Sequence, residues 1–480
     1  MSPILVISIL IAYFLLLIGI STLTTKHTTS ASFFTGDRKS PWYLVAFGMT
    51  GAALSGVTFI SVPGETGNTA WSYLVFVFGN AIGYIIISRF LLPLYYKLKV
   101  VSIYSYLKDR FGINAYKTGS LFFILSQSIG ASFRLFLVSC VLQIAFFDAL
   151  NIPFSVTVLI TIILIWIYTY KGGIRTIVFT DALQTLFMIA ALIATITIIS
   201  DRLQLGLTDL CSTIWDHPNS KIIDTDWQSG HFWIKQFFAG IAVTIVMNGL
   251  DQNMMQKNLS CKNTRESQKN MQWFTLSFVI TNIMFLGLGV LLYRYAEVYN
   301  ITLPTKTDEI YAFLSLNHFG LVASIFFLLG ITAAAYSSAD SALTALTTSF
   351  CVDILGIDIN KSENKIMKTR THIGFSFAMF LIIILFREIN DSSVVSSIFK
   401  VAGYTYGPLL GLYAFGLFTR FKINDKLCPV VCITSPIICY IISKNSIDWL
   451  WGYKFGFELL IFNGLLTFLG LFLLKTKTHK

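Results

Sequence analysis

The stretch "FGMTGAALSGVTFISVPGETG", Phe47–Gly67, is the most informative part of the sequence, because it is apolar enough for a membrane helix and yet is interrupted. Glycine and serine weaken its middle, and Pro63 with Gly64 is expected to stop the helix before the acidic Glu65. Unwound backbone at membrane depth is tolerated only where it lines a cavity or is buried in protein. The alternative interpretation is that its small residues only let neighbouring helices pack closely.

A second interrupted segment, "FFAGIAVTIVMNGLDQN" at Phe237–Asn253, lies five candidate spans further along the chain. Gly240 is in its middle, and Asn248, Gly249 and Asp251 are at its inner end. Interruptions at corresponding positions of two halves are the pattern expected of inverted-repeat transporters, whose broken helices hold the binding site. The five-span offset therefore favours a binding site over simple packing.

The composition places most of the chain in lipid. Of its 480 residues, 55% are hydrophobic and only 12% are charged, whereas about 25% are charged in soluble domains. The mean hydropathy is +0.70. Because about 20 apolar residues cross a bilayer as a helix, the chain has thirteen candidate spans: 3–21, 42–62, 71–95, 118–146, 152–170, 176–200, 232–250, 274–296, 319–352, 372–388, 395–419, 428–443 and 456–474.

The connecting segments predict an orientation in the cell membrane. Most of their lysines and arginines, Lys257 among them, fall on one side together with the basic tail, and the positive-inside rule places that side in the cytoplasm. An odd number of spans then leaves the N-terminus outside. This placement accounts for the net charge of +11, so no nucleic acid partner is expected. The first segment lacks the features of a cleaved signal peptide and is expected to be retained.

A third stretch, "AAAYSSADSALTALTT" at Ala333–Thr348, is unusually polar for a membrane span. A buried carboxylate such as Asp340 is costly there unless it is paired, hydrated or bound to a cation. Hard cations such as sodium prefer oxygen ligands. The alternative is that the hydroxyls bond back to their own helix or join neighbouring helices. Helical periodicity gathers four positions on one face: Ala334, Ser337, Ser338 and Ser341.

Two further charged residues fall inside apolar segments. Asp181 follows Thr180 in "KGGIRTIVFTDALQTLFMI", where it either pairs with Arg175 at a helix start or is a partner of the serine-rich face. Arg134 is far from either end of its span. An unpaired arginine at that depth is expensive, so it either neutralises an acid of the protein or binds an acid of a solute.

Several motifs in the same order resemble the sodium:solute symporter family, which includes sodium/glucose, sodium/proline, sodium/iodide and sodium/sialate carriers. The resemblance covers most of the chain, and Lys257 stands where the family usually has arginine. Besides the two interrupted segments, the motifs are "SASFFTGDRKSPWYLVAFGMTGAALSG", "IYSYLKDRFG", "KGGIRTIVFTDALQT", "GLDQNMMQKNLSCKN", "AAAYSSADSALTA" and "GYTYGPLLGLYAFGLF".

The resemblance implies an all-α polytopic membrane protein with about 13 transmembrane helices in a single transporter domain, 1–480. Its fold is the amino-acid/sodium symporter-like one, with two inverted five-helix repeats, one extra N-terminal span and two extra C-terminal spans. The expected divisions are an extra span and inside loop at 1–41, the repeats at 42–200 and 232–419, an outside loop at 201–231, and the last two spans with a cytoplasmic tail at 420–480.

The resemblance also implies a sodium site. It places backbone carbonyl ligands on Gly51 and Leu54, and carbonyl and hydroxyl ligands on Ala334, Ser337 and Ser338. Some members hold a second sodium ion at the acid corresponding to Asp181, with lower serines of the same stripe. Here Asp340 stands at one of those positions beside Ser341, and the number of ions is left open.

The implied activity is sodium-coupled import of a small polar organic solute, with no enzymatic activity expected. If Arg134 binds the solute, the cargo is a carboxylate such as a sialate, a monocarboxylate or an amino acid. The alternatives are a sodium-coupled sugar or polyol symporter and a proton-coupled carrier of the same fold. The expected partners are sodium, the solute and membrane lipid, and the sequence predicts no oligomeric state. Candidate solute-binding residues are Ser55, Thr58, Ser61, Phe76, Asn80, Gln127 and Arg134.

Overall fold

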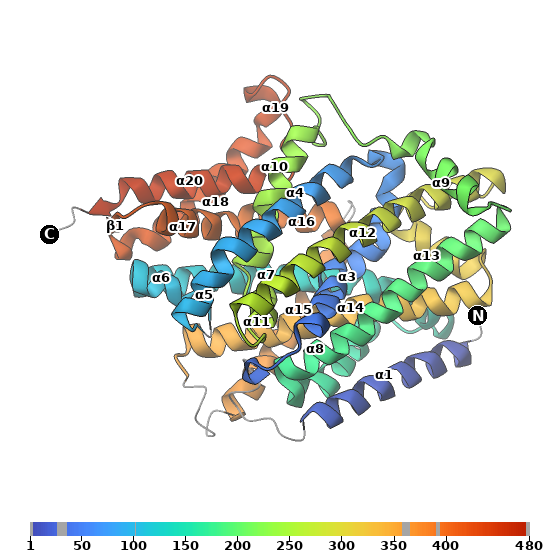
Figure 1. Cartoon of the computed structure of the whole chain (residues 1–480), viewed down its shortest axis with the longest axis horizontal. Coiled ribbons are helices and arrows are strands. Elements are labelled where there is room, and N and C mark those ends of the chain that lie inside the picture. Colours follow the sequence, from blue (N-terminus) through green and yellow to red (C-terminus); the bar gives the residue numbers. More distant parts are fainter. Residues whose placement is uncertain (1–2, 26–35, 101, 358–364, 390–393, 477–480) are drawn as a thin grey trace.

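The computed structural model describes residues 3–25, 36–100, 102–357, 365–389 and 394–476, which form a bundle of helices (Figure 1). Within these ranges, eight helices are long and apolar enough to cross a membrane, or nine if a bent pair counts as one span. The chain is therefore an integral membrane protein. Figure 1 shows that the first helix begins at one end of the bundle and the last long helix ends at the other.

The main helices are α1 (Pro3–Thr25), α3 (Trp42–Thr69), α4 (Ser72–Ile86), α5 (Leu92–Leu98), α6 (Ser105–Arg110), α7 (Ile113–Leu142), α8 (Phe154–Arg202), α9 (Leu207–Trp215), α10 (Trp233–Thr244), α11 (Gln252–Asn258), α12 (Thr264–Val298), α13 (Thr307–Asn317), α14 (Leu321–Ser349), α15 (Lys365–Ile389), α16 (Val394–Thr405), α17 (Gly407–Phe418), α18 (Cys428–Lys444), α19 (Ser446–Trp449) and α20 (Leu459–Leu473). Four of them continue as short π-helical turns, Ile87–Leu91, Gln143–Phe147, Ile245–Gly249 and Phe350–Ile354. A small antiparallel pair, β1 (Lys422–Ile423) and β2 (Lys475–Thr476), places Lys422 opposite Thr476.

Helical backbone is continuous over α8, Phe154–Arg202. Thr161 and Asp181 would be about 30 Å apart in a straight helix, yet they contact the adjacent residues Tyr336 and Ser337 of α14. The element α8 is therefore bent, and its apolar stretches Phe154–Ile167 and Ile174–Arg202 correspond to the expected spans 152–170 and 176–200. The expected span 395–419 is divided at Tyr406 into α16 and α17. Four shorter apolar helices overlap expected spans: Ser8–Thr24, Phe154–Ile167, Gly407–Phe418 and Leu459–Leu473.

The interruption of α3 is confirmed in the weakened middle of the span, whereas the expected stop at Pro63 and Gly64 is wrong. Ser55 has non-helical angles, φ 40° and ψ 173°, and the helix runs on through Pro63 to Thr69. Proline removes only one hydrogen bond from a helix whose packing compensates for it, but a serine with positive φ needs a surrounding structure that enforces the strain. The span therefore has one break, at Ser55.

The second interruption is confirmed at the expected place. The segment Trp233–Gly249 is bent by 71° relative to Gln252–Asn258. Asp251 starts the second part, where its carboxylate accepts hydrogen bonds from the backbone amides of Asn253 and Met254. An acidic N-cap of this kind satisfies amides that have no partner within the helix.

A close crossing of α4 and α10 fixes the wall between the two broken helices. A Cβ atom at Gly79 would lie 2.2 Å from the carbonyl oxygen of Phe237, and one at Gly240 would lie 2.2 Å from that of Phe76. Only glycine permits this approach of two backbones. The helices α3, α8 and α14 also pack against one another, so that the first broken helix is enclosed on several sides.

Candidate functional site

One turn of α8 brings the broken helix α3 and the serine-rich helix α14 together. The backbone amide of Gly51 donates to Thr185 Oγ1 at 3.1 Å, and Ser337 Oγ donates to Asp181 Oδ1 at 2.6 Å. Asp181 and Thr185 are one turn apart, and Thr185 Oγ1 also donates to the Asp181 carbonyl at 2.7 Å. The two predicted groups of oxygen ligands therefore meet across the same short segment of α8.

Glycine is required where α3 meets α8. A Cβ atom at Gly51 would lie 2.1 Å from Thr185 Oγ1, and one at Gly48 would lie 2.9 Å from the Asp181 Cβ atom. Carbonyls in the last turn of a helix have no helical donor. The break at Ser55 places the carbonyls of Gly51 and Leu54 in such a turn.

The residues predicted to hold a cation are all buried, but their serine hydroxyls have different hydrogen-bond partners. Ser337 contacts Asp181, whereas Ser338 Oγ donates to the carbonyls of Ala334 and Ala335 in its own helix, at 3.3 and 3.0 Å. Ser341 Oγ donates to Asp340 Oδ1 at 3.1 Å. Ser338 thus shows the back-bonding that the sequence left as an alternative, and the binding of a cation by these residues stays a prediction.

The expected pairing of Asp181 with Arg175 is wrong. Asp181 lies well inside α8, Arg175 is exposed, and Lys257 Nζ is 2.6 Å from Asp181 Oδ2. The Lys257 and Asp181 side chains are 1% and 0% exposed, so Lys257 is not the cytoplasmic loop residue that its position suggested. The other interpretation, in which Asp181 is a partner of the serine-rich face, is confirmed by the bond from Ser337.

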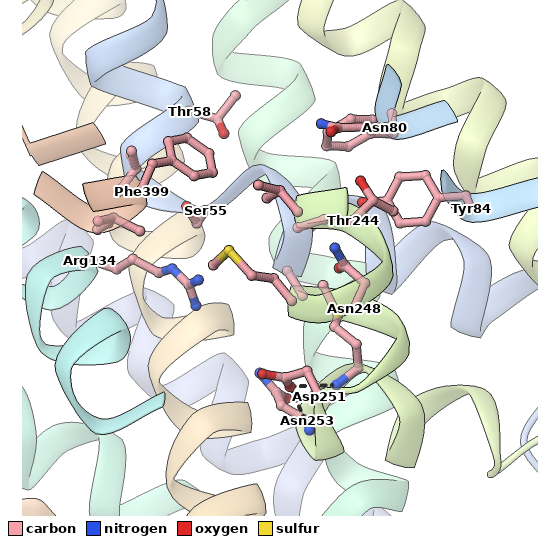
Figure 2. Close-up of a pocket in the computed structure, with 18 of the residues that line it drawn as sticks. Ser55, Thr58, Asn80, Tyr84, Arg134, Thr244, Asn248, Asp251, Asn253 and Phe399 are labelled. Atoms are coloured by element: carbon pink, nitrogen blue, oxygen red, sulfur yellow. Dashed lines mark hydrogen bonds between the residues drawn. The ribbon is translucent and has the colours of Figure 1, made fainter. Parts of the chain in front are cut away.

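A cavity lies beside these contacts, between the two broken helices (Figure 2). Its empty space is about 820 Å³, which includes the part open to solvent. Six of the seven predicted solute-binding residues line it: Ser55, Thr58, Phe76, Asn80, Gln127 and Arg134. Ser61 does not, because it lies a turn further along α3 and is fully buried.

Asp251 is the main cavity residue that the predicted set lacks. Its Oδ1 accepts from the amides of Asn253 and Met254 at 2.8 and 3.3 Å, and the hydroxyl of Tyr406 donates to its Oδ2 at 2.7 Å. The interruption "MNGLDQN" was the available signal, because it identified this segment as unwound. Other lining residues absent from the predicted set include Tyr84, Thr244, Asn248, Asn253 and Phe399.

Arg134 points into the cavity from α7, with Asp251 and Asn253 on another part of the wall (Figure 2). Within the described ranges its guanidinium forms no hydrogen bond and none of the ion pairs, which join His217 to Glu297, Lys257 to Asp181 and Arg294 to Glu297. It interacts electrostatically with Asp251 and Tyr406 without contacting the carboxylate. The cavity therefore presents a cation whose hydrogen-bond donors are available to a ligand.

A bundle with two broken helices beside a polar, buried cavity defines the protein as a secondary transporter. The model of the sodium:solute symporter family matches residues 33–426, and the chain belongs to this family.

Two curated relatives and one solved structure illustrate the similarity. The sodium/sialic acid symporter NanT of Aliivibrio fischeri is 24% identical over 92% of this chain and 88% of its own length. The sodium/sialic acid symporter SiaT of Proteus mirabilis is 22% identical over 90% and 88%. A substrate-bound, outward-open sodium-coupled sialic acid symporter has the same fold, with a TM-score of 0.83 at 20% identity over 98% of this chain and 97% of the other.

We predict that Asp251→Ala destabilises the protein more than Asp251→Asn does. Alanine removes the acceptor for two amides of α11 and for Tyr406, whereas asparagine keeps an oxygen at the cap. Loss of an N-cap costs about 1 kcal/mol. Thermal unfolding of the purified protein in detergent measures the difference. Equal unfolding temperatures for the two variants would contradict the capping role.

Proposed function

We propose that this chain imports a carboxylate solute together with sodium. The observation that supports this most directly is Arg134, whose guanidinium faces the cavity without a hydrogen bond or ion-pair partner among the described residues. Burying an arginine without a partner is costly, so a site that keeps one is suited to an anionic ligand. The printed names of NanT and SiaT, which carry sialic acid, support the same class of solute.

The solute we propose has a carboxylate and a separate hydrogen-bond donor, as a sialate has. Arg134 binds the carboxylate with its planar pair of donors. Asp251 accepts from a hydroxyl or amine of the solute, and Phe76 and Phe399 cover its apolar surface. A neutral sugar would leave Arg134 unpaired, which is why we place the sugar or polyol alternative second.

We propose that sodium binds between α3 and α14. Its ligands are the carbonyls of Gly51, Leu54 and Ala334 with the hydroxyls of Ser337 and Ser338, since oxygen ligands suit a hard cation. The ion holds the broken turn of α3 against α14, and Ser55, in that turn, lines the solute cavity. Sodium and solute then both bind more tightly to the same closed state, and this preference couples their binding. A ligand with equal affinity for two states would not shift the equilibrium between them.

We further propose thirteen spans in the cell membrane, with inverted repeats at 42–200 and 232–419, the N-terminus outside and the C-terminus in the cytoplasm. The paired breaks in α3 and between α10 and α11 support the repeats. The opposite positions of the start of α1 and the end of α20 support an odd number of crossings (Figure 1). Each positive charge carried inward then gains about 2.3 kcal/mol per 100 mV.

Replacing sodium by choline should abolish concentrative uptake of sialate into proteoliposomes that contain the wild-type protein. Ser337→Ala should raise the half-saturating sodium concentration about tenfold, because the loss of one oxygen ligand costs about 1.4 kcal/mol. Ser376→Ala is a matched control, since Ser376 is a buried serine that only donates to the His372 carbonyl of its own helix. Uptake that persists unchanged in choline would rule out sodium coupling and favour the proton-coupled alternative.

Arg134→Ala should reduce the affinity for sialate at least about thirtyfold, because truncating a buried charge pair costs about 2–5 kcal/mol. The same substitution should reduce the affinity for the methyl ester of this solute much less, because the ester has no carboxylate charge. Arg294→Ala is the control, since Arg294 is exposed and pairs with Glu297 on the surface of α12. Competition binding in sodium measures both ligands. Transport of a neutral sugar that is unaffected by Arg134→Ala would remove the carboxylate assignment.

A further inference from the structure

The ion pair between Lys257 and Asp181 occupies a position that a metal cation could take. The ammonium of Lys257 is 2.6 Å from Oδ2 of Asp181, and the hydroxyl of Ser337 is 2.6 Å from Oδ1. One carboxylate oxygen therefore accepts a hydrogen bond, and the other is paired with the ammonium. Neither charged side chain is accessible to solvent, since their exposed fractions are 1% and 0%.

We propose that the ammonium of Lys257 is a tethered cation that takes the place of a sodium ion at Asp181. A second positive charge on the same carboxylate would be repelled by the ammonium at close range in a medium that screens poorly. Sodium can reach Asp181 only if Lys257 leaves or is removed. This inference rests on the proposed function and specifies its ion stoichiometry: Asp181 contributes no sodium ion to the cycle in the state described here.

The position of Lys257 links this cation to the solute cavity. Lys257 lies on α11, a helix of seven residues, and Asp251 caps the start of that helix while lining the cavity. A helix this short moves as one piece. A solute that contacts Asp251 therefore acts on the start of α11, and a cation that displaces Lys257 from Asp181 acts on its end. Ser337, at the proposed sodium site, donates to the same carboxylate. Lys257 thus connects the ion and solute sites without being a ligand of either.

A second buried carboxylate, Asp340, could hold a sodium ion of its own, which the experiment has to distinguish from an ion at Asp181. It is buried on α14, accepts from Ser341 at 3.1 Å, and interacts electrostatically with Tyr13, as Asp181 also does. A sodium ion bound there would not depend on Lys257. The test therefore compares sodium counts between variants rather than relying on the count of the wild type alone.

The experiment is equilibrium binding of radioactive sodium alone to the purified full chain in nanodiscs, with choline balancing the ionic strength. Lys257→Met, which keeps the length of the side chain without its charge, should bind one more sodium ion per chain than the wild type. Lys257→Arg should keep the wild-type count, because it keeps the tethered charge. The double variant Lys257→Met with Asp181→Asn should return to the wild-type count, because it removes the carboxylate that the added ion uses.

Several results would overturn the inference. One is a folded Lys257→Met protein that binds the same number of ions as the wild type. Another is a double variant that binds fewer ions than the wild type, which would show that Asp181 binds sodium while Lys257 is present. The double variant buries no unpaired charge, so this comparison remains decisive if Lys257→Met does not fold. A wild type that binds no sodium at all would instead contradict the proposed function.

Discussion

The structure depends on a carboxylate buried in the middle of a membrane helix. An isolated charge at the position of Asp181 would be expensive, and the ammonium of Lys257 with the hydroxyl of Ser337 offsets that cost. These contacts hold α11 and α14 against α8, and one turn further along α8 Thr185 holds the broken helix α3 through the amide of Gly51. Every element that we assign to ion binding is therefore fixed relative to Asp181.

The contacts of α3, α11 and α14 with α8 also place the solute cavity next to the proposed sodium site. Ser55, in the strained turn of α3, lines the cavity together with Thr58, and Gly51 in the preceding turn contacts Thr185 of α8. On the far wall, Arg134 and Asp251 offer opposite charges, and Asp251 is held by the start of α11 and by Tyr406. The two sites thus share the short segments α11 and the turn at Ser55.

Local sequence patterns predicted the apolar spans, the two interrupted helices and most of the cavity wall, because hydropathy and glycine or proline content act over a few residues. They also predicted a helix stop at Pro63 and Gly64 that the structure lacks, because proline is a strong local signal, whereas the packing that keeps α3 helical there is tertiary. They also misread Lys257 as a loop residue, since a lysine near the end of a span looks the same whether it faces the cytoplasm or a buried acid. The partner that decides its role is 76 residues away, at Asp181. For the same reason, the sequence could not show whether the partner of Arg134 is an acidic residue of the protein or a solute.

We propose that sodium binds where the broken turn of α3 meets the serine-rich face of α14. Hydrogen exchange of the purified protein, in sodium and in choline without any solute, is a direct test of this site. Sodium should slow exchange in peptides that cover residues 51–58 and 334–341, while peptides of α18 and α20 should exchange alike in both salts. Equal exchange of the first two peptides in both salts, or protection spread evenly over the bundle, would show that sodium does not bind there.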